Sequence, residues 1–496
     1  MKAANAVVNR EPAAVDVLPL PAPPAGRGSR VALVVIVAGA VAATVVLFLP
    51  LTREAIGLSA IALMVCLIVL KVPIAIALFV PAVIGMFALQ GPRLVVNVLG
   101  SLPYGSVASW TLSVVPMFVF MGLLLWRSGV TATLFDAARA WVSWLPAGLA
   151  VSTNVAGTGL AAVSGTTVGT TYALARMALP EMLKSGYDKR IAIGSVMAAG
   201  LPGQLIPPSI LLVVYAGVAA VPVGPQLLAG IGPGILVSLL VAVSLVVVGL
   251  IRKPAAADTE PATAAPSRWR SLVRAWPVPV LVLIIVGGMF SGMFTATEAG
   301  AVAAFFSVIL ALLALRPRAG LTAIGEAAVG AVGTTGSIFF ILMGTEALSR
   351  MLTITGLTKV FVNWVGALNL QAWQFVVLMI VVYLVLGMVM ESLPMMLLTV
   401  PILIPTLNSL DIPLIWFGVF VVLMGELAVI TPPVGILSFV IYSVLQDPEV
   451  TRGRTFSLGD VFTASLWVLP PALLLCVLMI LFPEIVTFIP DLMASR

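Results

Sequence analysis

The stretch Glu-Leu-Ala-Val-Ile-Thr-Pro-Pro-Val-Gly-Ile, residues 426–436, places two adjacent prolines inside a nearly continuous apolar run. Proline lacks a backbone N–H and clashes with the preceding turn, so it kinks or breaks a helix. In hydrocarbon, the carbonyl groups that lose their partners cannot bind water instead. A break at this position therefore needs a reason.

The composition is that of a polytopic membrane protein. The chain has 496 residues, of which 61% are hydrophobic and 9% are charged. Soluble domains carry about 25% charged residues. One bilayer crossing takes roughly 20 residues, so we expect an all-α protein with about 11–12 transmembrane helices and two re-entrant hairpins.

The residue inventory also excludes several kinds of chemistry. The sequence has no histidine, the commonest general base and metal ligand, and its two cysteines lie in apolar runs. We therefore expect no enzyme and no cofactor. The net charge of +6 is attributed to the basic bias of cytoplasmic loops rather than to nucleic acid binding.

Two composition breaks divide the chain. Residues 1–30 are rich in Ala and Pro and predict a disordered cytoplasmic tail. After this tail we expect an extra transmembrane helix at 31–51. A second break at 252–276 predicts a cytoplasmic connector between two halves, 52–251 and 277–496. The distribution of Lys and Arg places the N-terminus in the cytoplasm.

The double proline occurs twice, and this repetition explains the break. Pro207-Pro208 and Pro432-Pro433 lie 225 positions apart, and so do two earlier prolines, Pro180 and Pro405. Each unit opens on a polar interruption, at 164–167 in the first half and at Glu391-Ser392 in the second. Each half is therefore predicted to hold one hairpin and one helix broken at its proline pair.

The loops inside the two units differ in charge. Residues 184–190 are strongly basic, whereas residues 407–414 contain neither Lys nor Arg. By the positive-inside rule, these loops face opposite sides of the membrane, which predicts inverted repeats. Inverted repeats with interrupted helices are typical of secondary transporters whose site lies at the membrane midplane. The competing interpretation is that the prolines only kink packed helices.

Broken helices expose backbone groups that can form a binding site. Carbonyl and hydroxyl oxygens suit a small cation, and N–H groups at half-helix starts suit an anion. The predicted cation-binding residues are Ser164, Gly165, Thr166, Thr167, Gly203, Pro207, Glu391, Ser392, Thr431, Pro432 and Gly435. The predicted substrate-binding residues are Thr166, Ser209, Glu391 and Arg350.

Charged residues within spans are costly unless paired, so each one is a candidate functional group. Glu391 and Glu426 lie at the breaks of the second half, where they either join the site or cap a helix end. Glu298 is expected to cap a helix start. Glu346 and Arg350 are spaced i,i+4 and are expected to pair, with a substrate-facing Arg350 as the alternative.

Residues 164–182, Ser-Gly-Thr-Thr-Val-Gly-Thr-Thr-Tyr-Ala-Leu-Ala-Arg-Met-Ala-Leu-Pro-Glu-Met, resemble the large membrane subunit of tripartite ATP-independent periplasmic (TRAP) transporters, the DctM-like family. Segments 206–210, 295–299 and 431–435 fit the same family in order. The resemblance implies an elevator-type, multi-pass symporter of the ion transporter superfamily in the bacterial inner membrane. Its implied coupling ion is sodium, with no further metal, and its implied substrate is an organic acid, by default a carboxylate.

The resemblance also implies two protein partners, a small four-helix membrane subunit and a periplasmic substrate-binding protein. Three features depart from the family pattern: Glu391 is found where an aspartate is usual, the helix at 31–51 precedes the normal first helix, and the connector at 253–267 is longer than expected. Three alternatives remain, namely a stand-alone carboxylate or anion symporter, an intramembrane enzyme, and a non-transporting assembly subunit.

Overall fold

The computed structural model describes residues 27–49, 52–130, 132–251, 267–388, 390–432 and 435–495. These residues form α-helices, two short 3-10 helices and turns, and none of them lies in a strand. The predicted tail up to residue 26 and the connector at 252–266 lie outside the described residues.

The elements of the first half are α2 (Arg27–Leu47), α3 (Arg53–Val69), α4 (Ile74–Gln90), α5 (Pro92–Val107), η1 (Trp110–Ser113), α6 (Val114–Arg127), α7 (Ala132–Val142), α8 (Gly148–Ser164), α9 (Thr167–Lys184), α10 (Lys189–Ala199), η2 (Pro202–Gln204), α11 (Ile210–Ala219), α12 (Val223–Ala229) and α13 (Ile231–Ile251). The predicted helix at 31–51 is α2, which begins four residues earlier.

The elements of the second half are α14 (Arg268–Ala275), α15 (Pro277–Phe290), α16 (Ala296–Ala314), α17 (Pro317–Thr355), α18 (Leu357–Ala367), α19 (Ala372–Gly387), α20 (Ser392–Ser409), α21 (Leu414–Ile430), α22 (Ile436–Val444), α23 (Pro448–Thr451), α24 (Leu458–Leu481) and α25 (Glu484–Ala494).

The described helices agree with a membrane protein. Six segments are long and apolar enough to cross a bilayer, or seven if the bent pair α14–α15 is one span. Five further apolar helices are 10–17 residues long. One of the six, Ser392–Ser409, is an arm of the second hairpin, and the five shorter helices are not long enough to span a membrane unaided, so the number of crossings, about 11–12, stays a prediction.

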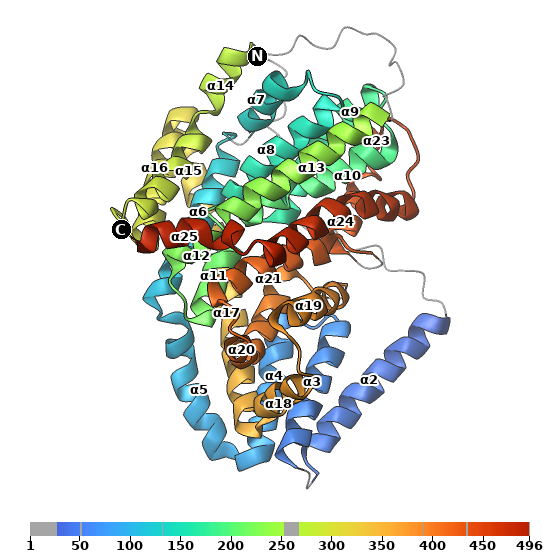
Figure 1. Ribbon diagram of the computed structural model, residues 1–496, viewed down its shortest axis with the longest axis vertical. Coiled ribbons are helices and arrows are strands. Elements are labelled where there is room, and N and C mark those ends of the chain that lie inside the picture. The colour runs from blue at the N-terminus through green and yellow to red at the C-terminus, as the bar shows by residue number, and fades with distance from the viewer. Residues whose placement is uncertain are drawn as a thin grey trace.

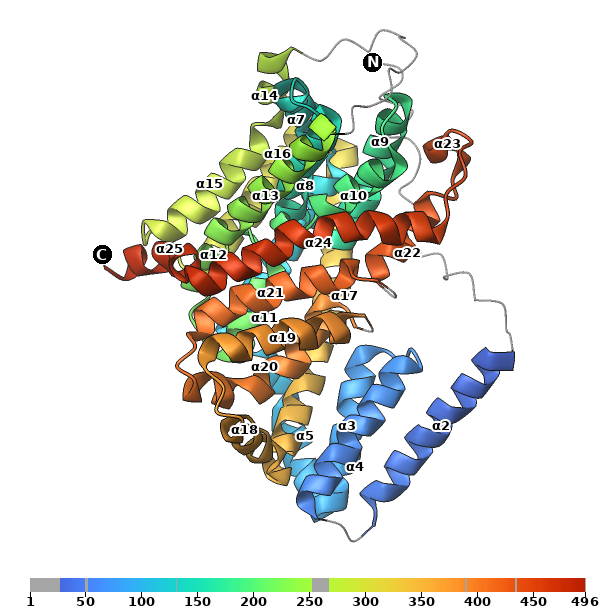
Figure 2. The same ribbon diagram turned by 45° about the vertical axis from the view of Figure 1, so that its right-hand side comes forward.

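The helices of the two halves repeat at one offset. The second arm of each hairpin is α9 in the first half and α20 in the second half. Both helices are 18 residues long, and they begin and end 225 positions apart. The helices that follow, α10 and α21, also begin 225 positions apart. In Figures 1 and 2, α8 and α9 lie in the upper part of the molecule and α20 lies in the lower part, with α21 between them. This arrangement supports inverted repeats.

The first helix break is buried inside the protein. Helix α10 ends at Ala199 and α11 begins at Ile210, and only η2 and turns lie between them. Every residue from 201 to 209 is buried except Ile206, which is half-buried. Non-helical backbone is tolerated at membrane depth where protein surrounds it, so the first proline pair meets that condition. In the second half, α21 ends at Ile430 and α22 begins at Ile436.

The buried apolar residues form two main cores, and Leu398 and Ile402 of the hairpin helix α20 also pack against the smaller one. A smaller apolar core joins α2–α5 to the C-terminal part of α17 through residues such as Met64, Leu78 and Met351. A much larger core contains the hairpins, the broken helices, α13 and α24. Figure 2 shows α2–α5 gathered at the lower end of the molecule, below α19–α21.

The segments rich in Lys and Arg, at 127–139, 184–190 and 268–274, lie at one end of the molecule, the upper end in Figure 1. We call this the basic end. Three ion pairs lie at this end, namely Arg127–Glu326, Arg139–Glu181 and Arg176–Asp447. The indole of Trp141 on α7 also donates a hydrogen bond to the carbonyl of Arg268 on α14, at 3.2 Å. One common face for these segments is what the positive-inside rule requires of cytoplasmic loops.

Candidate functional site

The tip of the first hairpin is a short polar turn between α8 and α9. Helix α8 ends at Ser164, and Gly165 adopts a left-handed conformation with φ of 65°. Thr166 is exposed at the N-cap of α9, where its side chain makes no capping bond. The Ser164 hydroxyl lies 2.8 Å from the hydroxyl of Thr170, one turn into α9. The tip therefore presents hydroxyl oxygens and the start of a helix.

This tip packs directly against the first helix break. A β-carbon at Gly165 would lie 2.6 Å from Cδ1 of Ile210, the first residue of α11. A β-carbon at Gly203 would lie 2.1 Å from the β-carbon of Ala161 in α8. Glycine is needed at both positions for this approach. The structure thus brings the first tip against the first break, and Pro207 within that break is buried.

Ser209, predicted as a substrate contact, has a structural partner. The residue is fully buried, and its hydroxyl accepts a hydrogen bond from the backbone N–H of Leu212 at 3.2 Å. It is the N-cap of α11. Capping a helix start satisfies one of its free N–H groups.

The second tip begins with Glu391, the N-cap of α20. Its side chain makes no capping bond and the residue is exposed. The capping role considered for Glu391 is therefore not the one that the structure shows. The next residue, Ser392, is buried, and a β-carbon at Gly425 of α21 would lie 2.8 Å from the Ser392 β-carbon. The second tip and the second broken helix are as tightly packed as the first pair.

Carbonyl oxygens converge at the second break. A β-carbon at Gly435 would lie 2.9 Å from the carbonyl oxygen of Thr431 and 3.1 Å from those of Ile430 and Val429. The Thr431 hydroxyl donates a hydrogen bond to the carbonyl of Leu427 at 2.7 Å. Pro432 is half-buried beside them, and Pro433 lies outside the described residues. These oxygens are of the kind predicted for a small cation.

The carboxylate of Glu426 connects the two hairpin tips. This residue of α21 is 2% exposed. The Thr167 hydroxyl at the start of α9 donates a hydrogen bond to its Oε2 at 2.5 Å. The Ser392 hydroxyl at the start of α20 donates one to its Oε1 at 3.2 Å. We call this arrangement the carboxylate bridge.

The carboxylate bridge is built on repeated positions. Thr167 and Ser392 are 225 residues apart, and so are Gly200 and Gly425. A β-carbon at Gly200 would lie 2.6 Å from the Thr167 side chain, which matches the close approach of Gly425 to Ser392. Both halves thus keep one contact between hairpin tip and broken helix.

The acid itself is present in only one half. The position that corresponds to Glu426, again by an offset of 225, is Leu201. A buried carboxylate in a membrane protein is costly unless donors satisfy it. The two hydroxyls supply these donors. Glu391 directly precedes Ser392, so a second acid lies next to the bridge in the chain.

The remaining charged candidates have partners of their own. Arg350 donates a hydrogen bond to Glu346 at 2.8 Å, as the i,i+4 spacing predicted, and a second one to Ser101 of α5 at 3.3 Å. Glu298 forms a capping box with Thr295 at the start of α16, which confirms its capping role. The recorded partners of Arg350 thus lie on α17 and α5, and its predicted contact with substrate remains a prediction.

The sequence matches one protein family over most of its length. The family model of the tripartite ATP-independent periplasmic transporter, DctM component, matches residues 61–485. The chain is 32% identical over 390 residues to a C4-dicarboxylate TRAP transporter large permease protein from Pseudomonas aeruginosa, covering 77% of this chain and 84% of that protein.

Two other relatives carry different substrate names. An ectoine/5-hydroxyectoine TRAP transporter large permease protein from Ruegeria pomeroyi is 28% identical, covering 87% of this chain and 98% of its own length. A sialic acid TRAP transporter permease protein from Haemophilus influenzae is 27% identical, covering 87% of this chain and 68% of its own length.

The fold also resembles that of a solved transporter. The crystal structure of the Alcanivorax borkumensis YdaH transporter superposes with a TM-score of 0.56 at 14% identity. The match covers 79% of this chain and 90% of that chain. At this identity, the likeness concerns the fold alone.

Proposed function

Because the chain belongs to the DctM component family of tripartite ATP-independent periplasmic transporters, we propose that it is the large permease subunit of a sodium-coupled importer of an organic acid. The observation that carries this proposal is the carboxylate bridge. One buried acid, Glu426, accepts hydrogen bonds from the tips of both hairpins, beside both interrupted helices. A midplane site between repeats is where secondary transporters bind substrate and coupling ion.

The oxygen atoms at the second break support sodium as the coupling ion. Carbonyl groups of Val429, Ile430 and Thr431 point toward the backbone at Gly435. Glu391 contributes a carboxylate that does not cap its helix. Hard cations prefer such oxygen ligands. In the first half, the hydroxyls of the tip at 164–167 would play the corresponding part.

The helix starts at the two tips support an anionic substrate. Thr166 and Glu391 lie at the N-caps of α9 and α20, and neither side chain caps its own helix. Free N–H groups at helix starts bind carboxylates. The substrates named for the relatives, C4-dicarboxylates, ectoine and sialic acid, share a carboxylate group. Both observations support a carboxylate substrate between the tips.

The membership implies the rest of the assembly. A periplasmic binding protein would deliver the substrate, and a small four-helix subunit would accompany this chain in the bacterial inner membrane. The basic end of the molecule would face the cytoplasm, with the N-terminus on the same side. An elevator movement of the hairpins would require sliding where Leu398 and Ile402 of α20 pack against the core of α2–α5.

Uptake into proteoliposomes tests this function. The vesicles would hold this chain and its small subunit, with the binding protein and labelled carboxylates outside, with and without an inward sodium gradient. We expect uptake that requires both sodium and the binding protein. Uptake driven by protons would contradict sodium coupling, and uptake without any binding protein would assign the chain to stand-alone symporters.

A further inference from the structure

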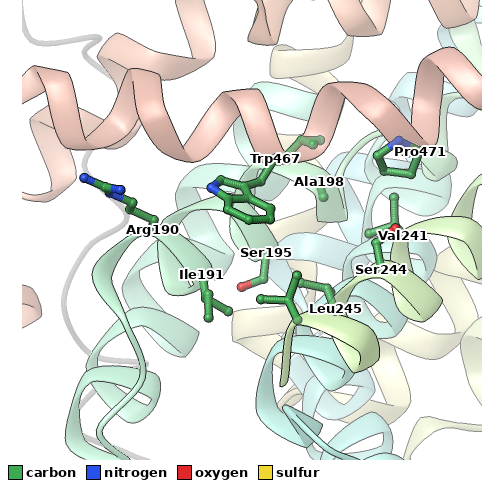
Figure 3. A pocket seen from close by; sticks show the side chains of 12 residues that line it. Arg190, Ile191, Ser195, Ala198, Val241, Ser244, Leu245, Trp467 and Pro471 are labelled. Carbon is green, nitrogen blue, oxygen red and sulfur yellow. The ribbon is translucent and has the colours of Figure 1, made fainter. Parts of the chain in front are cut away.

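A groove on the outer surface of the hairpin part has no place in the transport site. Helices α10, α13 and α24 line it, and its cavity volume is about 50 Å³, so it is a shallow groove open on one side. Figure 3 shows Ser195 and Ala198 of α10 facing Leu245 of α13, with the ring of Trp467 from α24 beside them. The groove is narrow and lies between helices that belong to both halves of the chain.

The polar atoms inside the groove are already satisfied. The Ser195 hydroxyl donates a hydrogen bond to the carbonyl of Ala192 at 2.9 Å, and the Ser244 hydroxyl donates one to the carbonyl of Leu240 at 2.8 Å. Most of the other lining residues are apolar, for example Val241, Leu245 and Pro471. The groove can therefore contact part of a hydrocarbon chain without leaving a polar group unpaired.

The surface around the groove belongs in hydrocarbon. On α13, Leu239 and Val243 are more than half exposed, and on α24, Leu466 is 57% exposed. Both helices are long and apolar enough to span a bilayer. Exposed leucines and valines on spanning helices face lipid chains, so the groove opens toward lipid rather than water.

A cation stands at one end of the groove. Arg190 lies in the first turn of α10, at the basic end of the molecule, and is exposed. Among the described residues its guanidinium has no hydrogen-bond partner. Two acids are near: Asp188 accepts a hydrogen bond from the Arg190 backbone N–H at 2.8 Å, and Asp460, which accepts one from the Ser457 hydroxyl at 2.9 Å, is attracted electrostatically by Lys189 and Arg190. The neighbouring Lys189 binds the carbonyl of Thr455 at 2.7 Å.

We propose that this groove binds one anionic phospholipid of the leaflet at the basic end. Part of one acyl chain lies in the groove between α10, α13 and α24, and the phosphate binds the guanidinium of Arg190. Basic positions at the ends of transmembrane helices bind phospholipid headgroups, and tryptophan is enriched at this level of the membrane. The lipid would contact both α10, which is part of the first broken helix, and α24, which lies near the end of the second half.

Photolabelling with two lipids tests this site. The full chain with its small subunit would be placed in vesicles that contain phosphatidylglycerol or phosphatidylcholine with a photoreactive acyl chain. We expect phosphatidylglycerol to label peptides of α13 and α24. Ser244→Phe, which fills the groove, should strongly reduce this labelling, whereas Val243→Phe, its lipid-facing neighbour, should leave it unchanged.

The headgroup contact has its own pair of variants. Arg190→Gln should lower phosphatidylglycerol labelling about fivefold and leave phosphatidylcholine labelling unchanged, because one basic side chain contributes about a fivefold factor to anionic lipid binding. Arg318→Gln, an exposed basic residue on α17, is the matched control. The comparison of Arg190→Gln with Arg318→Gln tests the lipid site even if Ser244→Phe fails to fold.

Three results would overturn the proposal. Equal labelling by both lipids would indicate ordinary surrounding lipid. Equal effects of Ser244→Phe and Val243→Phe would place the label outside the groove. Protection of these peptides from both lipids by the small membrane subunit would identify a protein surface instead.

Discussion

Thr167 and Ser392 are 225 residues apart in the chain, and their hydroxyls donate hydrogen bonds to opposite oxygens of one carboxylate, that of Glu426. Each belongs to the tip of a different hairpin. The distance between the tips is thus fixed by one buried acid. A change at Glu426 should therefore affect both tips together.

The charge of Glu426 is expected to matter more than its size. Glu426→Gln keeps the shape and one acceptor but replaces two charge-assisted hydrogen bonds with neutral ones, which are weaker by about 1–2 kcal/mol each. We expect sodium-dependent uptake to fall about tenfold or more, because 1.4 kcal/mol corresponds to a factor of about ten. Glu326→Gln, in an exposed ion pair at the basic end, should transport normally. Wild-type uptake by Glu426→Gln would show that the bridge is dispensable.

The two donors should act through the same carboxylate. Thr167→Val and Ser392→Ala each remove one hydroxyl, and each should lower uptake. Combined with Glu426→Gln, either change should have a much smaller further effect, since residues that share one network couple by about 0.5–3 kcal/mol. A double-mutant cycle on uptake rates measures this coupling. Strictly additive effects would contradict a functional bridge.

The repeat is predictable from the sequence because short stretches of residues mark each of its parts. Proline pairs, polar interruptions and loop charges give the break positions, and the i,i+4 spacing gives the Glu346–Arg350 pair. These signals depend on neighbouring residues alone. They predicted that the residues at 164–167 belong with the first break, and the structure places them together.

The carboxylate bridge could not be predicted in the same way. Thr167 and Glu426 are 259 positions apart, and nothing in either local sequence identifies the other. The local sequence leaves Glu426 open between a site role and helix capping, and the structure shows neither a cap nor a free side chain. Ser209 was predicted from its polarity as a substrate contact, but polarity does not distinguish it from a helix cap. The offset of 225 does identify one part of this arrangement from the sequence, because it shows that Gly200 and Gly425 occupy corresponding positions in the two halves.

Ser209→Ala separates these two roles. Loss of an N-cap costs about 1 kcal/mol of stability, so we expect a lower thermal midpoint in detergent. The substrate concentration at half-maximal uptake should stay the same. A raised half-saturation constant at unchanged thermal stability would return Ser209 to the substrate site.

Gly203 should tolerate no side chain. Its β-carbon would approach Ala161 to 2.1 Å and the backbone nitrogen of Ala162 to 2.7 Å, and such overpacking costs about 1–3 kcal/mol. We therefore expect Gly203→Ala to lower the thermal midpoint. Gly287→Ala on α15 is the control, because no atom lies within 4 Å of its β-carbon position. That change should stabilise the helix by about 0.5–1 kcal/mol. Equal midpoints for the two variants would refute the close approach.

Arg350 can be compared with its own partner. The pair is partly exposed, at 38% and 44%, and such pairs contribute about 0–1 kcal/mol. We expect Arg350→Gln and Glu346→Gln to have the same small effect on uptake, within about fivefold. A rise in the half-saturation constant for Arg350→Gln alone would instead support the predicted contact with substrate.

Leu201 and Glu426 occupy corresponding positions in the two halves, and this difference has a consequence for the side of the membrane to which the site opens. In an alternating-access cycle, repeats of inverted topology exchange their conformations as the site opens to one side and then to the other. Identical halves would make both openings equal in free energy. An acid in one half and a leucine in the other removes that equality, and a difference of 1.4 kcal/mol would make one opening about ten times as populated as the other. The unloaded transporter would then wait with its site open toward one compartment, and the residue at 201 or 426 would determine which.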